Sequence, residues 1–421
     1  MTLHDSTPLH DGRVIIVGAG AAGMMAALVA ARRGRQVLLL EKMQQPGLKL
    51  RITGKGRCNL TNTAALKDFL THVGSDARFM RNSFAQFFNT QLMQLFEELG
   101  VPLTVERGGR VYPQSGKSLD IFLALVTTLE AMPNVEIRKD CRVATLIIEE
   151  GRCNGVRLAD GTSLRASSTL LATGGLSYPL TGSTGDGYRM AAQAGHSVEP
   201  THPALVRLDT STPIPPELVG FVLKNVRLTI TDSAGRKLTE QQGELTFTPT
   251  GIDGPLVLSA SRHATGPLHN GEALVAHIDL KPAVEAATLD RRLIADLNAN
   301  GTRLLNDALR LWLPAELVPL ALRQLHIEYY KRLNQINGAE RHRLLTFLKD
   351  IALPLTGTGG YEEAVVTQGG VRLKEVNPKT MESRIAAGLY LAGEVLDLDA
   401  DTGGYNLQLA FSTAYAAGSH C

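Results

Sequence analysis

Near its start the chain reads Val14-Ile15-Ile16-Val17-Gly18-Ala19-Gly20-Ala21-Ala22-Gly23, and this run shapes the architecture more than any other. The β-branched residues predict a short buried strand, and the glycines match the pattern G-x-G-x-x-G at the turn into an alanine-rich helix. Glycine permits the tight turn and lets a pyrophosphate approach the positive N-terminus of the helix. We therefore predict a dinucleotide-binding unit whose cofactor contacts are Gly18, Gly20, Ala22 and Gly23. A glycine-rich turn that serves only helix packing is the alternative.

A second strand, Gln36 to Glu41, completes the βαβ pattern. Glu41 follows Gly23 by 18 residues and ends this strand, where an acid can accept hydrogen bonds from ribose hydroxyls. Val14 to Ala31 carries no charge over 18 residues and is just long enough to be scored as a membrane span. Because glycines break this run after a short strand, we predict no membrane segment.

Composition places the chain among globular proteins. It has 421 residues with 44% hydrophobic and 20% charged residues, which excludes disorder. The formal charge of +2 gives no bulk case for nucleic acid. Cys58, Cys141, Cys153 and Cys421 form no C-x-x-C pair, and the segment Met1 to Gly12 lacks the basic start of a secretory signal. We expect a cytoplasmic protein without a metal site.

The 41 glycines exceed the roughly 29 that average usage would give, and many of them cluster with charge. The stretch from Lys42 to Lys67 contains six basic residues and no acid. Glycines there allow close backbone approach to a planar ring, and cations suit a pyrophosphate or a reduced anionic flavin. The predicted cofactor contacts in this stretch are Lys42, Lys49, Gly54, Gly56, Arg57, Cys58 and Asn59. A solvated basic loop is the alternative.

Two further strand ends carry glycines that suit the same cofactor. An apolar strand runs into Thr173-Gly174-Gly175, and the strand Leu389 to Val395 contains Gly393-Glu394. The segment Thr402-Gly403-Gly404-Tyr405-Asn406-Leu407-Gln408 then opens the last helix, whose N-terminus would stabilise negative charge on reduced flavin. These segments resemble the second and third contact points of FAD-binding two-dinucleotide-fold flavoproteins. On that resemblance the predicted contacts are Val143, Thr173, Gly174, Gly175, Gly393, Glu394, Gly404, Tyr405, Asn406 and Leu407.

On these motifs the sequence resembles the bacterial aminoacetone oxidase family, also described as BaiN-like flavoproteins. The resemblance rests on residues 53–62, on residues 172–179, and on residues 392–397 with residues 402–408. It implies an α/β fold with a discontinuous, Rossmann-like FAD-binding domain of the two-dinucleotide-fold type, interrupted by an antiparallel β module and a helical module. FAD is the implied cofactor. We place the FAD domain at residues 1–195 and 355–421, the β-rich substrate module at 196–280 and the helical module at 281–354.

The resemblance leaves the reaction open. Activities associated with the family are reduction of a conjugated steroid enone, oxidation of a small amine and reduction of uridine in ribosomal RNA. We favour a reductase of an activated C=C bond that is fed by NADH or NADPH and acts on a small molecule. The two other activities and a non-enzymatic FAD-bound redox sensor are the alternatives. The sequence makes no prediction of oligomeric state.

Candidate catalytic residues are few. Cys58 is one, because Lys55 and Arg57 beside it would favour a thiolate; a small buried residue under the flavin is the preferred interpretation. Tyr178 is the other, as a residue that would stack or donate a proton. An RNA partner is less favoured than a small molecule, although residues 323–349 interleave six basic residues with Tyr329, Tyr330 and Phe347.

Overall fold

The computed structural model describes residues 12–74 and 76–421, so most of the segment considered above for a secretory signal lies outside the described residues. The chain divides into two compact units. Unit 1 comprises the residues up to Pro203 together with Tyr361–Cys421, and unit 2 is Ala204–Gly360. Unit 1 is therefore discontinuous.

Unit 1 is built on a parallel sheet with the strand order β19-β10-β1-β2-β6. Its strands are β1 (Arg13–Val17), β2 (Gln36–Leu40), β6 (Val135–Arg138), β10 (Ser168–Leu171) and β19 (Leu389–Leu391). Val14 to Val17 are all buried, as expected for a central parallel strand with both faces covered. The last strand, β19, comes from the C-terminal part of the chain, so both ends of the sequence contribute to one sheet.

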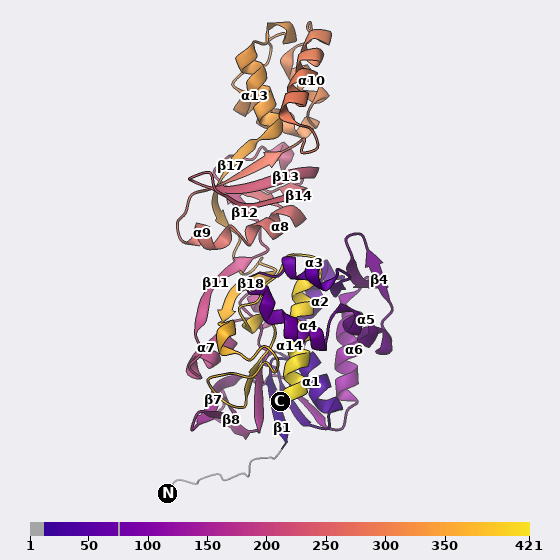
Figure 1. The fold of residues 1–421 in the computed structure, drawn as a ribbon, viewed down its shortest axis with the longest axis vertical. Helices are drawn as coiled ribbons and strands as arrows, with labels where there is room; N and C mark the ends of the chain where they lie inside the picture. Colours follow the sequence, from indigo (N-terminus) through magenta and orange to yellow (C-terminus); the bar gives the residue numbers. More distant parts are fainter. Residues whose placement is uncertain (1–11, 75) are drawn as a thin grey trace. The chain divides into compact units, whose positions relative to one another are not determined.

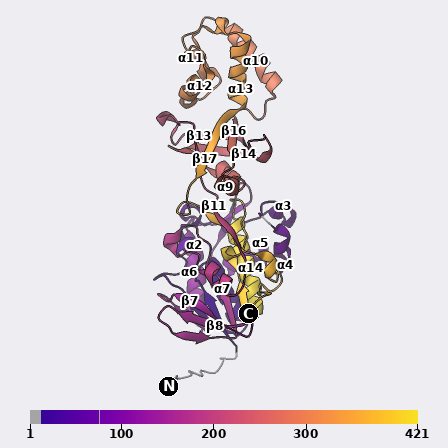
Figure 2. The same cartoon turned by 90° about the vertical axis from the view of Figure 1, so that its left-hand side faces the viewer.

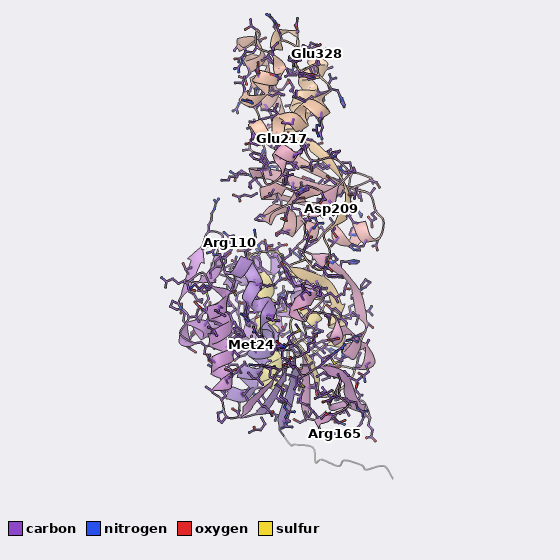
Figure 3. The ribbon with its side chains drawn as sticks, turned by 180° about the vertical axis from the view of Figure 1, so that it is seen from behind. Met24, Arg110, Arg165, Asp209, Glu217 and Glu328 are labelled. Atoms are coloured by element: carbon purple, nitrogen blue, oxygen red, sulfur yellow. The ribbon has the colours of Figure 1, made fainter. Side chains whose placement is uncertain are left out.

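Helices cover this sheet, and two of them meet closely. Helix α1 (Ala21–Arg32) packs against α14 (Tyr405–His420), as Figure 1 shows. A Cβ on Gly418 would lie 2.7 Å from the carbonyl oxygen of Ala26, so the helices approach at backbone distance. Met24 of α1 is fully buried in the interior of unit 1 (Figure 3). The other helices are α2 (Leu48–Ile52), α3 (Leu66–Thr71), α4 (Arg81–Gln86), α5 (Asn89–Glu98), α6 (Ser118–Glu130) and α7 (Asp186–Gln193).

Three smaller sheets complete unit 1. They have the orders β3-β5-β4, β7-β8-β9 and β11-β18. Their strands are β3 (Thr61–Asn62), β4 (Leu103–Glu106), β5 (Arg110–Pro113), β7 (Val143–Glu149), β8 (Arg152–Leu158), β9 (Ser163–Arg165), β11 (Val198–Ala204) and β18 (Val366–Val371). One predicted strand is shorter than expected: the run Leu389 to Val395 leaves the sheet after Leu391, because a 3-10 turn begins at Gly393.

Unit 2 joins a closed barrel to helices, and Figure 2 shows the helices of residues 286–349 together beyond the barrel strands. The barrel order is β12 (Leu208–Thr210), β15 (Gly251–Asp253), β14 (Lys237–Phe247), β13 (Val222–Asp232), β16 (Leu274–Asp279) and β17 (Ile351–Thr358). The helices are α8 (Pro255–Ser261), α9 (Thr265–His269), α10 (Ala286–Ala299), α11 (Leu305–Ala308), α12 (Val318–Leu325) and α13 (Gly338–Lys349). Strand β17 follows the helices in sequence and closes the barrel, so the β-rich and helical stretches form one unit.

The predicted α/β class, with a Rossmann-type parallel sheet and additional antiparallel sheets, is confirmed. The uncharged run Val14 to Ala31 divides between β1 and α1. Across residues 12–74 and 76–421, the structure holds no helix with the length and apolar character needed to cross a membrane.

Candidate functional site

The glycine turn after β1 leaves an open position in front of α1. A Cβ on Gly18, where φ is +101°, would lie 2.6 Å from the carbonyl oxygen of Ala172, and a Cβ on Gly23 would lie 1.8 Å from the carbonyl oxygen of Gly18. A Cβ on Gly20 would instead meet nothing within 4 Å. The first N–H groups of a helix have no partner within it, so those of α1, which include Ala22, face this opening.

Glu41 follows β2 and holds the glycine turn in place. It is only 9% exposed, and its Oε2 accepts a hydrogen bond of 2.9 Å from the backbone N–H of Ala19. Its Oε1 accepts from the N–H of Met43, also at 2.9 Å. A carboxylate oxygen can accept more than one hydrogen bond, so Glu41 keeps capacity for the predicted ribose hydroxyls.

Lys42 is engaged by an acid that sequence reasoning did not single out. Its Nζ lies 2.7 Å from Oδ2 of Asp186 at the start of α7, and 2.5 Å from Oγ1 of Thr184. Burial, followed by the charge of Arg142, lowers the pKa of Lys42 below its ordinary value. A predicted phosphate contact by Lys42 would therefore share the ammonium with Asp186.

Lys49 and Glu394 form an ion pair at the carboxyl ends of β10 and β19. Nζ of Lys49 lies 2.7 Å from Oε2 of Glu394 and 2.5 Å from Oγ of Ser177. Oε1 of Glu394 accepts from Oγ of Ser177 and from the N–H of Thr367, both at 2.8 Å. The two charged side chains are 22% and 19% exposed, which leaves one side of the pair open. Four distant segments thus converge on one polar cluster.

The same sheet edge lies next to the glycine turn. A Cβ on Gly393 would lie 2.8 Å from Cβ of Ala22 in α1, and a Cβ on Gly175 would lie 2.5 Å from Oγ1 of Thr367. Thr173 and Gly174 precede Gly175 in the loop that leaves β10. The predicted contacts after β1, β10 and β19 are therefore brought together.

Arg57 is held on the outside of the basic loop. Its guanidinium carbon lies 4.3 Å from the ring centroid of Tyr112, and its Nη2 pairs with Glu106. The side chain of Arg57 is 47% exposed, while Gly54 and Gly56 in the same loop have left-handed backbone angles. A phosphate contact by Arg57 would require it to share or leave Glu106.

Cys58 is fully buried behind this loop, with no exposed surface. Burial raises the pKa of the Cys58 thiol to about 12. The thiol is therefore neutral at pH 7, which argues against a reactive thiolate and favours the interpretation of a small packing residue.

The loop and the start of α14 contact each other directly. Gly404 precedes α14, and a Cβ there would lie 2.3 Å from the carbonyl oxygen of Thr61. The amide of Asn62 donates to the carbonyl of Gly403 at 3.1 Å. With its amide oriented to satisfy both neighbours, Asn59 accepts from the N–H of Gly404 at 3.0 Å and donates to Thr61 at 3.3 Å. Two motifs from opposite ends of the chain thus build one surface.

Tyr405, Asn406 and Leu407 form the first turn of α14. The amide of Asn406 accepts from the N–H of Ala400 and donates to its carbonyl, both at 2.8 Å. This clamp fixes the segment that leads into the helix.

Val143, Tyr178 and Tyr188 each have a different environment in unit 1. Val143 is buried in the sheet β7-β8-β9, opposite Leu158, so its contact with a cofactor stays a prediction. Tyr178 has φ +54°, and its N–H donates to the carbonyl of Tyr361 at 2.8 Å. Tyr188 donates from its hydroxyl to the carbonyl of Glu394 at 3.3 Å, and burial raises its pKa well above the ordinary value.

Sequence reasoning missed several members of this region: Ser177, Asp186, Thr367, His72 and Asp401. Their partners lie far away in sequence, and Asp186, His72 and Asp401 carry no motif. Ser177 stands inside the run 172–179 that carried the family resemblance, and Thr367 begins the run 367–371 that the same resemblance covers.

The arrangement fits a dinucleotide. The open position at Gly20 faces a helix N-terminus suited to pyrophosphate, and Glu41 suits a ribose. The start of α14 supplies a second positive helix end, as a reduced flavin requires. No group of three His, Cys, Asp or Glu side chains suited to a metal ion occurs within the described part of the chain.

The comparison with known families decides the identity. The family described as HI0933-like protein Rossmann domain matches residues 12–420. The chain belongs to this family. The predicted BaiN-like resemblance is confirmed, and the chain is an FAD-dependent oxidoreductase.

Full-length relatives support this membership. The chain is 35% identical over 409 residues to the 3-dehydro-bile acid delta(4,6)-reductase of Clostridium scindens, which covers 96% of this chain and 98% of that protein. It is 33% identical over 403 residues to the ribosomal RNA dihydrouridine synthase of Escherichia coli, covering 96% of each chain. The solved 3-ketosteroid-delta4-(5alpha)-dehydrogenase from Rhodococcus jostii aligns over 100% of this chain and 98% of that one, at 16% identity and a TM-score of 0.49.

Proposed function

We propose that the chain reduces a C=C bond conjugated to a carbonyl group, with electrons from NADH or NADPH. The observation that carries the proposal is the full-length similarity to two enzymes whose names describe this kind of reduction. A delta(4,6)-reductase and a dihydrouridine synthase both saturate a C=C bond, on a steroid ring and on a uracil ring respectively. Amine oxidation finds no counterpart in these two names.

The residues of unit 1 would supply binding and electrostatics. The N-terminus of α1 and the turn at Gly20 would bind the pyrophosphate, and Glu41 would bind the ribose. The start of α14 would stabilise negative charge at the pyrimidine end of the flavin. When bound, FAD would supply the exchange of two electrons with nicotinamide and substrate, and the ion pair of Lys49 and Glu394 would contribute to its binding surface.

Anaerobic stopped-flow spectroscopy of the purified holoprotein tests the reductase proposal. NADH or NADPH should bleach the absorbance of oxidised flavin at least as fast as the enzyme turns over, and a small primary amine should not bleach it. Bleaching by the amine alone would instead identify an oxidase. A flavin that no donor of either class reduces would contradict both enzymatic assignments.

Reduction of uridine in ribosomal RNA is a second candidate, favoured by the relative from Escherichia coli. In the structure, three of the six basic residues of the segment that suggested RNA form ion pairs with acids. Lys331 pairs with Glu340 at 2.7 Å, and Arg341 pairs with Asp290 at 2.9 Å. Arg332 is exposed in the same segment.

An RNA-binding assay at several salt concentrations tests whether the RNA candidate uses this segment. For an RNA enzyme that uses this segment, Arg332→Ala should weaken binding and flatten the salt dependence, because each phosphate contact contributes to the slope. Lys331→Met removes the same charge from a residue held by Glu340 and serves as the matched control. Equal salt slopes for wild type and both variants would exclude this surface.

A further inference from the structure

A histidine and a carboxylate form a pair beside the first turn of α14. His72 follows α3, and its Nδ1 lies 2.9 Å from Oδ2 of Asp401. The N–H of Asp401 donates to the carbonyl of His72 at 2.9 Å, and Val73 bridges to Ala400 next to it. Backbone and side chain therefore hold the two residues together.

The imidazole ring is also fixed on its face. It stacks on the ring of Tyr405 with centroids 4.3 Å apart and an angle of 19° between the planes. Tyr405 in turn packs edge-on against Phe69, with centroids 4.7 Å apart. The side chain of His72 nevertheless stays 39% exposed, against 17% for Asp401.

This geometry is the one that prepares a histidine for proton transfer. A carboxylate that accepts from Nδ1–H fixes the tautomer and ring orientation, so that Nε2 exchanges protons with other groups. Exposure of the ring allows water or a substrate to reach it.

The pair is built on the segment that leads into α14. Asp401 lies three residues before Gly404, and Tyr405 is one of the predicted flavin contacts. Asn406 holds this segment through its two hydrogen bonds with Ala400. A proton donor mounted here is rigidly tied to the predicted cofactor site.

We propose that His72, positioned by Asp401, delivers the proton that completes C=C reduction; this rests on the proposed function. Saturation adds two hydrogens, of which one arrives with an electron pair from reduced flavin at one carbon. At the carbon next to the carbonyl a C–H bond forms with the electron pair of the former double bond, while the Nε2–H bond of the His72 imidazolium breaks. The substrate is reduced, the flavin is oxidised, and the neutral imidazole regains a proton from water.

The test separates the two half-reactions in the holoprotein. Reduction by NADH or NADPH should be unchanged in His72→Gln and His72→Ala. Reoxidation by 4-androstene-3,17-dione or a uridine-containing ribosomal RNA fragment, whichever reoxidises the wild type, should slow about 100-fold, the lower end of the range for general acid catalysis. Free imidazole should restore part of the rate in His72→Ala.

His277→Gln is the matched control. His277 has its Nδ1 2.8 Å from Oδ1 of Asp350 and is 30% exposed, but it lies on β16 in the barrel of unit 2. This variant should keep wild-type rates in both half-reactions. FAD content, measured from absorbance, should be the same in all three histidine variants.

Nitrogen NMR of ¹⁵N-histidine-labelled protein tests the positioning role of Asp401 without turnover. The neutral His72 ring should carry its proton on Nδ1 in the wild type, and Asp401→Asn should change this tautomer. A wild-type ring protonated on Nε2 would overturn the role of Asp401.

Other outcomes are equally decisive. Wild-type reoxidation rates in His72→Gln, or a slow His72→Ala that imidazole does not rescue, would overturn the proton-donor role alone. A wild type that nicotinamide reduces but that neither probe reoxidises would remove the proposed function, and the inference with it.

Discussion

One added methyl group should have different consequences at Gly20 and at Gly23. At Gly20 it should weaken FAD binding, and at Gly23 it should destabilise unit 1. In Gly20→Ala the new Cβ enters open space, and the backbone at Gly20, with φ −81°, accepts any residue. In Gly23→Ala the new Cβ would lie 1.8 Å from the carbonyl oxygen of Gly18. The first change occupies the position assigned to pyrophosphate, and the second forces the turn away from the helix.

The magnitudes follow from these distances. The Gly18 carbonyl would have to retreat by about 1 Å, which a close-packed interior resists. Overpacking costs up to about 3 kcal/mol, and the better helix propensity of alanine offsets about 1 kcal/mol, so Gly23→Ala should destabilise unit 1 by about 2 kcal/mol. Gly20→Ala should leave stability unchanged. It should lose one hydrogen bond to a charged phosphate, about 1.5–3 kcal/mol, or about 10- to 100-fold in FAD affinity.

Thermal unfolding of the apoproteins and titration with FAD measure both effects. Gly23→Ala should lower Tm by about 4–8 °C, whereas Gly20→Ala should match the wild type. Wild-type FAD affinity in Gly20→Ala would refute the assignment of the open position to the pyrophosphate. Equal Tm values for the two variants would show that the turn does not touch α1 as described.

Three further predictions concern charge and burial. Lys49→Met leaves Glu394 without its ion-pair partner, and one-fifth of the Glu394 side chain is exposed. The variant should therefore lower the free energy of unfolding of the apoprotein in urea by about 1–2 kcal/mol. An unchanged free energy of unfolding would show that the pair is dispensable for stability. Iodoacetamide at pH 8 should modify the half-buried Cys141 before the fully buried Cys58, and mass spectrometry of the labelled folded protein would measure the order. Modification of Cys58 first would contradict a buried, neutral Cys58 thiol. Burial, and then the charge of Asp399, raises the pKa of Asp397 to about 6 from an unfolded value of 3.8, so Asp397 makes the folded state less stable as pH rises from about 4 to about 6. Asp397→Asn should therefore raise Tm at pH 7 more than at pH 4, and an equal shift at both pH values would count against the raised pKa.

Local patterns in the sequence were sufficient for the core of unit 1. The strand Val14 to Val17, the glycine turn and the helix that follows were predicted because periodicity and turn chemistry act over neighbouring residues. The strand Leu389 to Val395 was predicted too long, because apolar composition does not show where Gly393 turns the backbone.

Side-chain pairs within the site were beyond reach for a different reason. Lys49 and Glu394 are 345 residues apart in sequence, and His72 and Asp401 are 329 apart. Each pair forms only because both chain ends enter one unit, and no local pattern encodes that meeting. The sequence indicated that Lys49 and Glu394 belong to the cofactor region, but not that they neutralise each other. For His72 it offered no signal, since a lone histidine after a short helix has no motif.

The most direct test of the central claim is a double-mixing, anaerobic stopped-flow experiment on the holoprotein. The flavin is first reduced with one equivalent of NADH or NADPH and then mixed with 4-androstene-3,17-dione or a uridine-containing ribosomal RNA fragment, with product analysis by mass spectrometry. Our account predicts that one of these probes reoxidises the flavin and gains two hydrogens per flavin. Reoxidation by oxygen alone, with both probes recovered unchanged, would contradict it.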